Sequence, residues 1–187
     1  MAYSDMIEKL VKLREMIRAR WELRRCDSVG PRTRAQGRMI IRKQGEIHVG
    51  SQTFFLSEMM PIELITLPGG VLEIGDKVGI NYGTSITAQT SVKIGTNCRI
   101  GQCCLIMDTD WHALDDYDKR PPGDPIVLEE NVWLAAHVTI LKGVTIGRNA
   151  IISAGSVVTS NVRPYTMVAG VPARLIKHLD EPELICR

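Results

Sequence analysis

The sequence predicts a mainly β protein built as a parallel β-helix of hexapeptide repeats, with an N-terminal α-helical cap and one long inserted loop. Three observations predict it: an aliphatic residue returns at every sixth position in the C-terminal half, the same period runs through the middle of the chain, and one irregular segment interrupts it. A period of six fits neither an amphipathic helix, which repeats at about 3.6 residues, nor a simple alternating strand. It is typical of a chain that turns a corner every six residues.

The first 43 residues are predicted to form a basic helical arm. They carry twelve Lys or Arg and five Asp or Glu, whereas the remaining residues carry eleven and sixteen. Apolar residues recur there at helical spacing: Met6, Leu10, Leu13, Ile17 and Trp21. We therefore expect an amphipathic helix over residues 4–25 that lays this stripe on the end of the β-helix, because stacked repeats need a different terminal unit. An arm that binds a membrane surface is the less favoured alternative, and we expect no nucleic-acid partner.

The β-helix is predicted to span residues 44–177. Two aliphatic series carry its period. The first runs through Ile74, Ile80, Ile86 and Val92 and resumes after a two-residue slip at Ile94, Ile100 and Ile106. The second consists of Leu128, Leu134, Ile140, Ile146, Ile152 and Val158. An extended residue advances roughly 3.3 Å, so six residues make a flat side about 20 Å long, and three sides close one triangular coil. The recurring aliphatic residue points inward and stacks on its counterpart in the next coil. This spacing does not determine the hand of the coil.

The longest break in the period, residues 107–125, is where we expect chemistry. It holds few aliphatic residues and six aspartates. His112 lies in this loop, with Asp108, Asp110 and Trp111 close to it in sequence. A neutral imidazole can take a proton near physiological pH, and a carboxylate can hold its tautomer and orientation. A loop carried on a rigid stack is a suitable place for a catalytic group.

Composition argues against several classes of protein. No apolar run approaches the roughly 20 residues that span a bilayer, and the N-terminal residues lack the basic-then-apolar pattern of a secretory signal. The five cysteines include no C-x-x-C pair, which argues against a disulfide framework or a cysteine zinc site. We therefore expect reduced thiols and a cytoplasmic protein.

Residues 132–177 read VWLAAHVTILKGVTIGRNAIISAGSVVTSNVRPYTMVAGVPARLIK. This segment closely resembles the C-terminal half of hexapeptide-repeat acyltransferases, and it looks most like sugar O-acetyltransferases: the galactoside and maltose acetyltransferases and the enzymes that acetylate capsule or lipopolysaccharide sugars. The resemblance covers about residues 45–177 and includes VGINYGTSI at residues 78–86. It implies a left-handed parallel β-helix that works as a homotrimer with active sites between subunits. It also implies acetyl-coenzyme A as the acyl donor and, as the acceptor, a sugar of surface polysaccharide biosynthesis.

The resemblance implies roles for single residues. His112 matches the loop histidine that acts as general base on the acceptor hydroxyl, and Asn81 matches an asparagine near that hydroxyl. Four further residues are candidates for binding the sugar on their own chemistry, apart from the resemblance: Asp108, Asp110, Trp111 and Tyr82. Asp108 or Asp110 would orient His112 or bind sugar hydroxyls, and Trp111 and Tyr82 would form an aromatic wall or serve only as packing. Six residues match positions of the coenzyme A site or its terminal turn: Trp133, Ala136, Ala154, Thr159, Pro172 and Arg174.

The chain departs from the family pattern at three positions. Ser160 stands where many relatives have lysine, which removes one phosphate contact. Ala135 replaces a glycine, which is a small change. Ala113 replaces the proline that follows the histidine in the galactoside enzymes, so the acceptor preference stays open.

Other functions are compatible with hexapeptide coils. An acetyltransferase of the same fold could act on an amino sugar, serine or an antibiotic. A γ-carbonic-anhydrase-like enzyme would bind zinc through three imidazoles, but His112 and His137 lie 25 residues apart with no third histidine at suitable spacing, so we expect no metal site. A non-catalytic scaffold would need neither coenzyme A nor His112. Residues 178–187 are expected to form a C-terminal tail.

Overall fold

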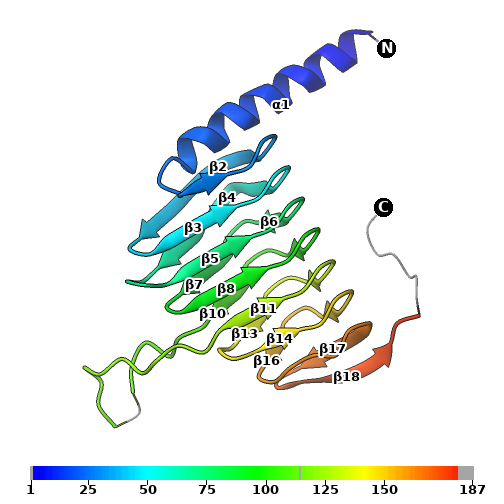
Figure 1. Cartoon of the computed structure of the whole chain (residues 1–187). Coiled ribbons are helices and arrows are strands. Elements are labelled where there is room, and N and C mark those ends of the chain that lie inside the picture. The colour runs from blue at the N-terminus through cyan, green and yellow to red at the C-terminus, as the bar shows by residue number, and fades with distance from the viewer. Residues whose placement is uncertain (1, 114, 181–187) are drawn as a thin grey trace.

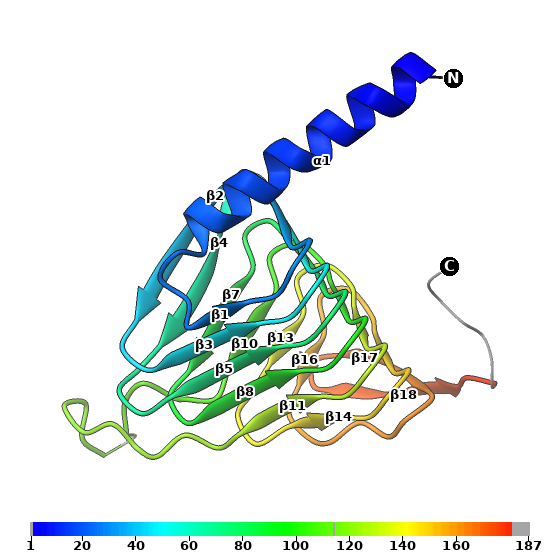
Figure 2. The same ribbon diagram turned by 45° about the horizontal axis from the view of Figure 1, so that its top comes forward.

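The six-residue period closes into a stack of triangular coils. In this computed structural model, which describes residues 2–113 and 115–180, the chain winds as a left-handed parallel β-helix with one N-terminal helix. Figure 1 shows the coils stacked along one axis, with the helix at the N-terminal end and a loop projecting from one side. Figure 2 looks closer to that axis and shows the three sides of the prism. The predicted fold class, with its N-terminal helix and inserted loop, is confirmed.

Each side of the prism is a parallel sheet with one strand from each coil. The first face holds β1 (Ser28–Val29), β3 (Glu46–Val49), β5 (Val71–Ile74), β8 (Ser91–Ile94), β11 (Ile126–Leu128) and β14 (Thr145–Ile146). The second face holds the first part of β4 (Phe54–Thr66), then β6 (Gly79–Asn81), β9 (Arg99–Ile100), β12 (Trp133–Leu134), β15 (Ile151–Ile152) and β17 (Thr166–Gly170). The third face holds the last part of β4, then β7 (Ser85–Ala88), β10 (Leu105–Met107), β13 (Thr139–Ile140) and β16 (Val157–Val158). Strand β2 (Arg34–Lys43) pairs with β4 along both of these faces.

The recurring aliphatic residues form the core as inward columns. On the second face, one column consists of Ile80, Ile100, Leu134 and Ile152, paired from coil to coil. Each of these side chains is at most 3% exposed. Burial of one such side chain contributes about 1.5–3 kcal/mol. The inward columns were predicted from the period and are confirmed.

The two-residue slip in the period is an enlarged corner. Val92 and Ile94 both lie in β8, and both are buried against the core. The extra residues therefore fall before β8, at Gln89 and Thr90, where the chain turns from the third face to the first. We call this corner, residues 88–91 and the matching positions of later coils, the loop edge, because the inserted loop leaves the stack from it.

Helix α1 (Ala2–Glu22) ends three residues before the predicted limit and meets the stack with an unexpected face. The stripe expected to pack on the stack faces solvent instead, with exposures of 49–66%: Met6, Leu10, Leu13, Ile17 and Trp21. Contact with the stack is made by Glu15 and Ala19, and by Leu23 just after the helix, each at most 7% exposed. The prediction that the apolar stripe covers the end of the β-helix is therefore wrong.

Polar partners on β2 explain the orientation of α1. The Glu15 carboxylate accepts hydrogen bonds from Arg34 at 3.1 Å and from Gln36 at 2.6 Å. The Glu22 carboxylate accepts the Met39 backbone N–H at 3.0 Å. A buried carboxylate needs such partners, so the acidic side of the helix turns toward β2 and the apolar stripe turns away.

The first coil begins before residue 44. Strand β1 pairs with β3, β2 pairs with β4, and Ala35 and Ile41 lie in the core. The predicted boundary at residue 43 is therefore wrong, and the stack starts just after α1. The β-helical pattern was missed here because the coil is made of strands with polar, largely basic outer faces.

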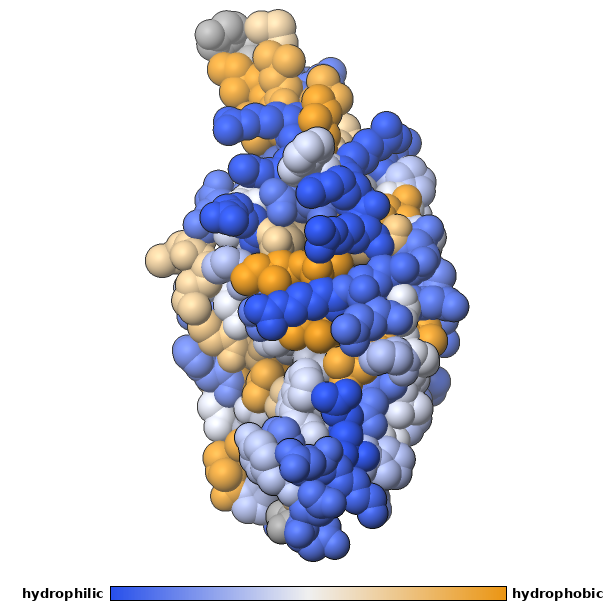
Figure 3. Space-filling view, turned by 90° about the vertical axis from the view of Figure 1, so that its left-hand side faces the viewer, coloured by the Kyte–Doolittle hydropathy of each residue, from blue (hydrophilic) through white to orange (hydrophobic). Residues whose placement is uncertain are grey.

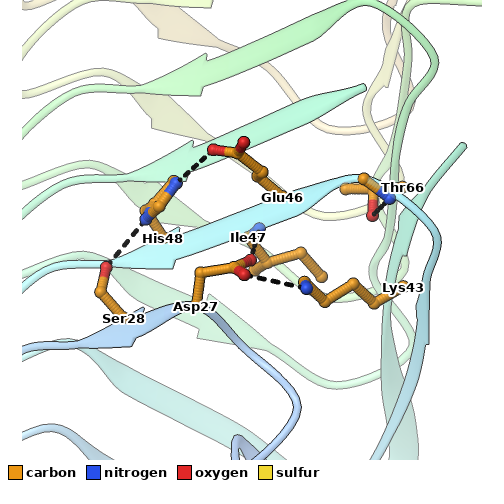
Figure 4. A network of polar contacts seen from close by, with 8 residues as sticks. Asp27, Ser28, Lys43, Glu46, Ile47, His48 and Thr66 are labelled. Atoms are coloured by element: carbon orange, nitrogen blue, oxygen red, sulfur yellow. Dashed lines mark hydrogen bonds and ion pairs between the residues drawn. The ribbon is translucent and has the colours of Figure 1, made fainter. Parts of the chain in front are cut away.

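Polar contacts tie this first coil together (Figure 4). The Asp27 carboxylate accepts the Ile47 N–H at 2.8 Å and pairs with Lys43 at 2.9 Å, and these contacts lower the pKa of Asp27. On the outer surface, His48 Nδ1 lies 3.0 Å from the Ser28 hydroxyl, and His48 Nε2 lies 3.0 Å from Glu46. The contact between Ser28 and His48 joins β1 to its neighbouring strand β3.

The C-terminal end of the stack is closed by a hairpin. Strand β18 (Ala173–His178) pairs antiparallel with β17, and Leu179 is buried after it. Most of the predicted tail, residues 181–187, lies outside the described residues. Within the described part of the chain, no helix is both long and apolar enough to cross a membrane.

Candidate active site

The inserted loop is fastened to the loop edge by Asp108. This residue is fully buried, and its carboxylate accepts three backbone N–H bonds at 2.6–2.8 Å, from Gln89, Thr90 and Ser91. Its carbonyl accepts the Asp124 N–H at 3.0 Å, where the loop returns to the stack. The Asp108 side chain thus caps the enlarged corner of the preceding coil. The prediction that it binds sugar is wrong, because its carboxylate faces the corner and not solvent.

Replacing Asp108 by Ala should destabilise the fold. The substitution leaves three N–H groups without their acceptor, and unsatisfied donors cost about 1–3 kcal/mol each when water cannot replace the partner fully. We expect the free energy of unfolding to fall by about 2–4 kcal/mol in denaturant titration. Asp110→Ala, which removes an exposed carboxylate two residues away, is the matched control and should cost less than about 1 kcal/mol. Equal losses in both variants would contradict the capping role.

His112 lies exposed in the loop and is held by Tyr117. Its Nδ1 lies 2.6 Å from the Tyr117 carbonyl oxygen, and the Tyr117 ring stacks on the imidazole with centroids 3.7 Å apart and an interplanar angle of 9°. A carbonyl oxygen only accepts hydrogen bonds, so Nδ1 carries the proton of the neutral imidazole and Nε2 keeps its lone pair. The backbone of Tyr117, rather than Asp108 or Asp110, therefore orients His112.

Asp110 and Trp111 shape the part of the loop next to His112. Asp110 pairs with Lys142 at 2.5 Å, which ties the loop to the next coil and raises the pKa of Lys142. The Trp111 backbone N–H donates to the Thr109 hydroxyl at 3.1 Å, and the Arg120 guanidinium lies 5.4 Å from the Trp111 ring centroid. Trp111 is half-buried and Asp110 is exposed, so both remain candidates for contact with a sugar.

Asn81 ends β6 at the corner between the second and third faces. Its Oδ1 accepts the Tyr82 N–H at 3.0 Å, and its side-chain NH₂ has no partner among the described residues. The left-handed residue of this corner is Gly83, with φ of 69°, so the turn does not require asparagine. Tyr82 is half-buried beside it. We call this corner and the matching positions of later coils the Asn81 edge.

Predicted pantetheine contacts lie along the same Asn81 edge. The Ala136 carbonyl accepts the Gly155 N–H at 2.9 Å, so these turns stack in successive coils, and Ala154 directly precedes Gly155. Trp133 begins β12 beside this edge and is 39% exposed. One edge of a single chain thus presents Asn81 and three of the six residues predicted to belong to the coenzyme A site.

His112 and Asn81 lie on different edges of the prism. The third face separates them, since the chain enters it at the Asn81 edge and leaves it at the loop edge. A four-residue strand such as β7 spans about 13 Å, and the loop projects away from the stack (Figures 1 and 2). The two residues do not converge within one chain.

A groove of about 640 Å³ lies at the C-terminal end of the stack. Thr159 and Arg174 line it, as do Ser160 and Arg163. The Arg163 guanidinium has no hydrogen-bond or ion-pair partner in the described part of the chain, and Arg174 donates only to the Ala173 carbonyl, at 2.9 Å. The groove therefore presents two cationic side chains, a suitable arrangement for phosphates.

Pro172 does not line this groove. It follows a cis peptide bond from Val171 in the turn between β17 and β18. Its place in the hairpin suits the terminal turn named from the sequence.

The described residues offer no evident metal centre. Within residues 2–113 and 115–180, no three His, Cys, Asp or Glu side chains gather closely enough to hold a metal ion. His137 is a turn residue with φ of 58° on the Asn81 edge. Burial raises the pKa of the Cys98 thiol to about 12 and that of Cys104 to about 11, so these two stay protonated.

Comparison with known proteins places the chain in a family. Residues 125–160 match the family model described as bacterial transferase hexapeptide (six repeats). The Escherichia coli protein WbbJ, named as a candidate lipopolysaccharide biosynthesis O-acetyl transferase, is 30% identical over 73% of this chain and 74% of its own length. The chain belongs to the hexapeptide-repeat acetyltransferases. Galactoside O-acetyltransferase of Escherichia coli is 35% identical to this hexapeptide-repeat protein over 60% of this chain and 57% of the galactoside enzyme.

The match to other relatives is partial. The chain spans only 54–64% of the length of four curated relatives, the galactoside enzyme among them. A hexapeptide-repeat acetyltransferase of Vibrio cholerae, solved with acetyl-coenzyme A, is 25% identical to this hexapeptide-repeat protein with a TM-score of 0.60, covering 92% of this chain and 85% of that one. AntD, an N-acyltransferase of Bacillus cereus, has a TM-score of 0.72 at 18% identity over 87% of this chain and 90% of that one, which shows a shared fold.

Sequence reasoning missed two residues of the candidate site, Tyr117 and Arg163. Tyr117 was not singled out, because a backbone carbonyl leaves no signal in side-chain patterns. Its ring, five residues after His112, was the available hint. Arg163 was also missed, although a basic residue three positions after Ser160 could have suggested a replacement for the lysine absent there.

Proposed function

We propose that this chain is an acetyl-coenzyme A-dependent O-acetyltransferase that acts on a sugar hydroxyl, with His112 as general base. The observation that carries the proposal is an exposed His112 whose Nε2 is left free, on the inserted loop of a chain whose relatives bear the names of sugar O-acetyltransferases. A surface polysaccharide is the favoured source of the acceptor, since WbbJ resembles the chain over most of both lengths.

The proton path follows from the tautomer of His112. Nδ1–H donates to the Tyr117 carbonyl, so Nε2 accepts the proton of the sugar hydroxyl as its oxygen attacks the thioester carbon. The tetrahedral intermediate then collapses, the carbon–sulfur bond breaks, and Nε2–H returns the proton to the leaving thiolate. The products are an acetyl ester and coenzyme A, with no covalent enzyme intermediate. Such catalysis contributes on the order of 10²- to 10⁴-fold.

The negative oxygen of the intermediate needs a donor. The side-chain NH₂ of Asn81 has no partner among the described residues, so it is available for this task. One such donor is worth roughly 3–4 kcal/mol in the transition state. Because Asn81 and His112 occupy different edges, we propose that each site forms between two subunits, in the homotrimer expected from the family.

The donor would lie along the Asn81 edge of one subunit. Ala136 and Ala154 present a path of small residues for the pantetheine arm, the exposed Trp133 ring lies beside it, and the groove with Arg163 and Arg174 suits the phosphates. We propose that Arg163 supplies the charge that Ser160 does not. Asp110, Trp111 and Tyr82 remain the candidate sugar contacts.

An acceptor screen that monitors release of free coenzyme A tests this function. Acetyl-coenzyme A is offered with free galactosides, nucleotide-linked sugars, lipid-linked saccharides and amino sugars. We expect release with a hydroxyl acceptor and an acetyl product that is labile in mild alkali, as an ester is. An alkali-stable amide formed on an amino sugar would show that the enzyme is an N-acetyltransferase and would contradict the proposed O-acetylation. Failure to bind coenzyme A would overturn the enzyme assignment in favour of a scaffold.

A further inference from the structure

The apolar stripe of α1 takes no part in the core or in the proposed reaction. At about 100° per residue, its five members fall within one narrow arc of the helix, and all are 49–66% exposed: Met6, Leu10, Leu13, Ile17 and Trp21. The helix extends beyond the stack (Figures 1 and 2), and apolar side chains gather on its projecting end (Figure 3). A contiguous apolar stripe left in water marks an interaction surface.

Cations border this stripe on both sides. On the helix, Arg14 and Arg18 lie on one side of the stripe, interleaved with the exposed Ile7 and Val11, and Lys9 and Arg20 lie on the other, all of them exposed. None of the four has an acidic partner in the described part of the chain. Glu8, Glu15 and Glu22 lie on the opposite side of α1, where Glu15 bonds to β2, whereas Asp5 lies one turn before Lys9. An apolar stripe edged by Lys and Arg is typical of helices that lie in the interface of a bilayer.

A second cationic feature continues the stripe at the end of α1. A groove of about 500 Å³ is lined by Trp21 and by four exposed arginines: Arg24, Arg25, Arg38 and Arg42. Arg38 and Arg42 form no ion pair with any described residue. Glu22, the acidic residue of the groove, is engaged by the Met39 N–H at 3.0 Å. The groove therefore offers unpaired guanidinium groups beside an exposed indole, a suitable combination for a phosphate-bearing headgroup.

We propose that α1 and this arginine groove dock the protein on an anionic membrane surface, with the stripe in the interface and the arginines on lipid phosphates. A second copy fits less well, because parallel helices sharing the stripe would oppose Lys9 and Arg14 of one copy to the same cations of the other. Nucleic acid would use the cations but leave the stripe in water. An anionic bilayer satisfies both features at once.

Vesicle co-sedimentation of the full-length protein tests the proposal. We expect binding to vesicles of phosphatidylcholine mixed with phosphatidylglycerol, weaker binding at high salt, and little binding to phosphatidylcholine alone. Arg38→Gln with Arg42→Gln should weaken binding by about tenfold to thirtyfold. Leu10→Gln with Ile17→Gln should weaken it by at least about tenfold.

Matched controls remove the same groups elsewhere. Lys77→Gln with Lys93→Gln removes two charges, and Met59→Gln with Met60→Gln removes two exposed apolar side chains; both pairs should bind like the wild type. Residues 10 and 17 are exposed, so folding and acetyl transfer to a small acceptor should persist in that variant. Equal binding to both vesicle types would overturn the proposal. A change of oligomeric mass caused by the Leu10 and Ile17 substitutions would overturn it too, because the stripe would then bind a second copy. Binding to a DNA duplex without binding to vesicles would also overturn it. Vesicle binding is read without any acetylation assay, so it stands or falls separately from the proposed function.

Discussion

Replacing His112 by Ala is expected to lower the rate of acetyl transfer by about 10²- to 10⁴-fold, the range contributed by a positioned general base. The loss should appear in kcat, because the proton moves only as the acceptor oxygen attacks. Affinity for coenzyme A should be unchanged, since His112 does not line the groove that holds Arg163 and Arg174. Release of coenzyme A gives the rate, and calorimetry with coenzyme A gives the affinity.

Two further variants separate chemistry from structure. Tyr117→Leu keeps the carbonyl that binds Nδ1 and removes the ring that stacks on the imidazole, so we expect an intermediate loss of about tenfold. His48→Ala removes another partly exposed imidazole from the first face, and its turnover should match the wild type. Near wild-type turnover in His112→Ala would eliminate the proposed mechanism.

The coils could be predicted because their physics is local and periodic. Ile80 and Ile100 stack in neighbouring coils, so the register of one coil fixes the register of the next. The spacing of the aliphatic residues alone therefore predicts the inward column. The loop could be predicted for the same reason, since a polar segment that breaks the period cannot continue the core. These features depend on which residues recur, and the sequence shows that directly.

Features that depend on polar partners could not be predicted in this way. Asp108 was predicted as a possible sugar ligand. Its carboxylate instead accepts hydrogen bonds from backbone amides of the preceding coil, seventeen to nineteen residues earlier in the sequence. The apolar stripe of α1 was expected to pack on the core. Because Glu15 accepts hydrogen bonds from Arg34 and Gln36 on β2, the acidic side of the helix faces the stack and the stripe faces away from it. In both cases a buried carboxylate selected the geometry, and its donors come from other coils or strands.

Mixing two inactive variants is expected to restore activity. Asn81→Ala removes the proposed oxyanion donor, which should cost about 10²- to 10³-fold, and His112→Ala removes the base. If each site takes His112 from one subunit and Asn81 from its neighbour, random assembly places both intact residues together in about a quarter of the sites. Subunits co-expressed in equal amounts should therefore show about a quarter of wild-type turnover per site, although neither variant is active alone.

The separation of the two edges makes this outcome decisive. Within one chain the third face lies between the Asn81 edge and the loop edge, so a site confined to one subunit would require the loop to fold across that face. Such a site cannot be rebuilt from two damaged subunits, and mixtures would then stay as inactive as their components. The double variant Asn81→Ala with His112→Ala, co-expressed with wild type, is the matched control. It should also retain about a quarter of the sites if residues are shared between subunits, but about half if each subunit is self-sufficient. The two arrangements thus differ in both mixtures, and the ratio of activities assigns the residues to one chain or to two.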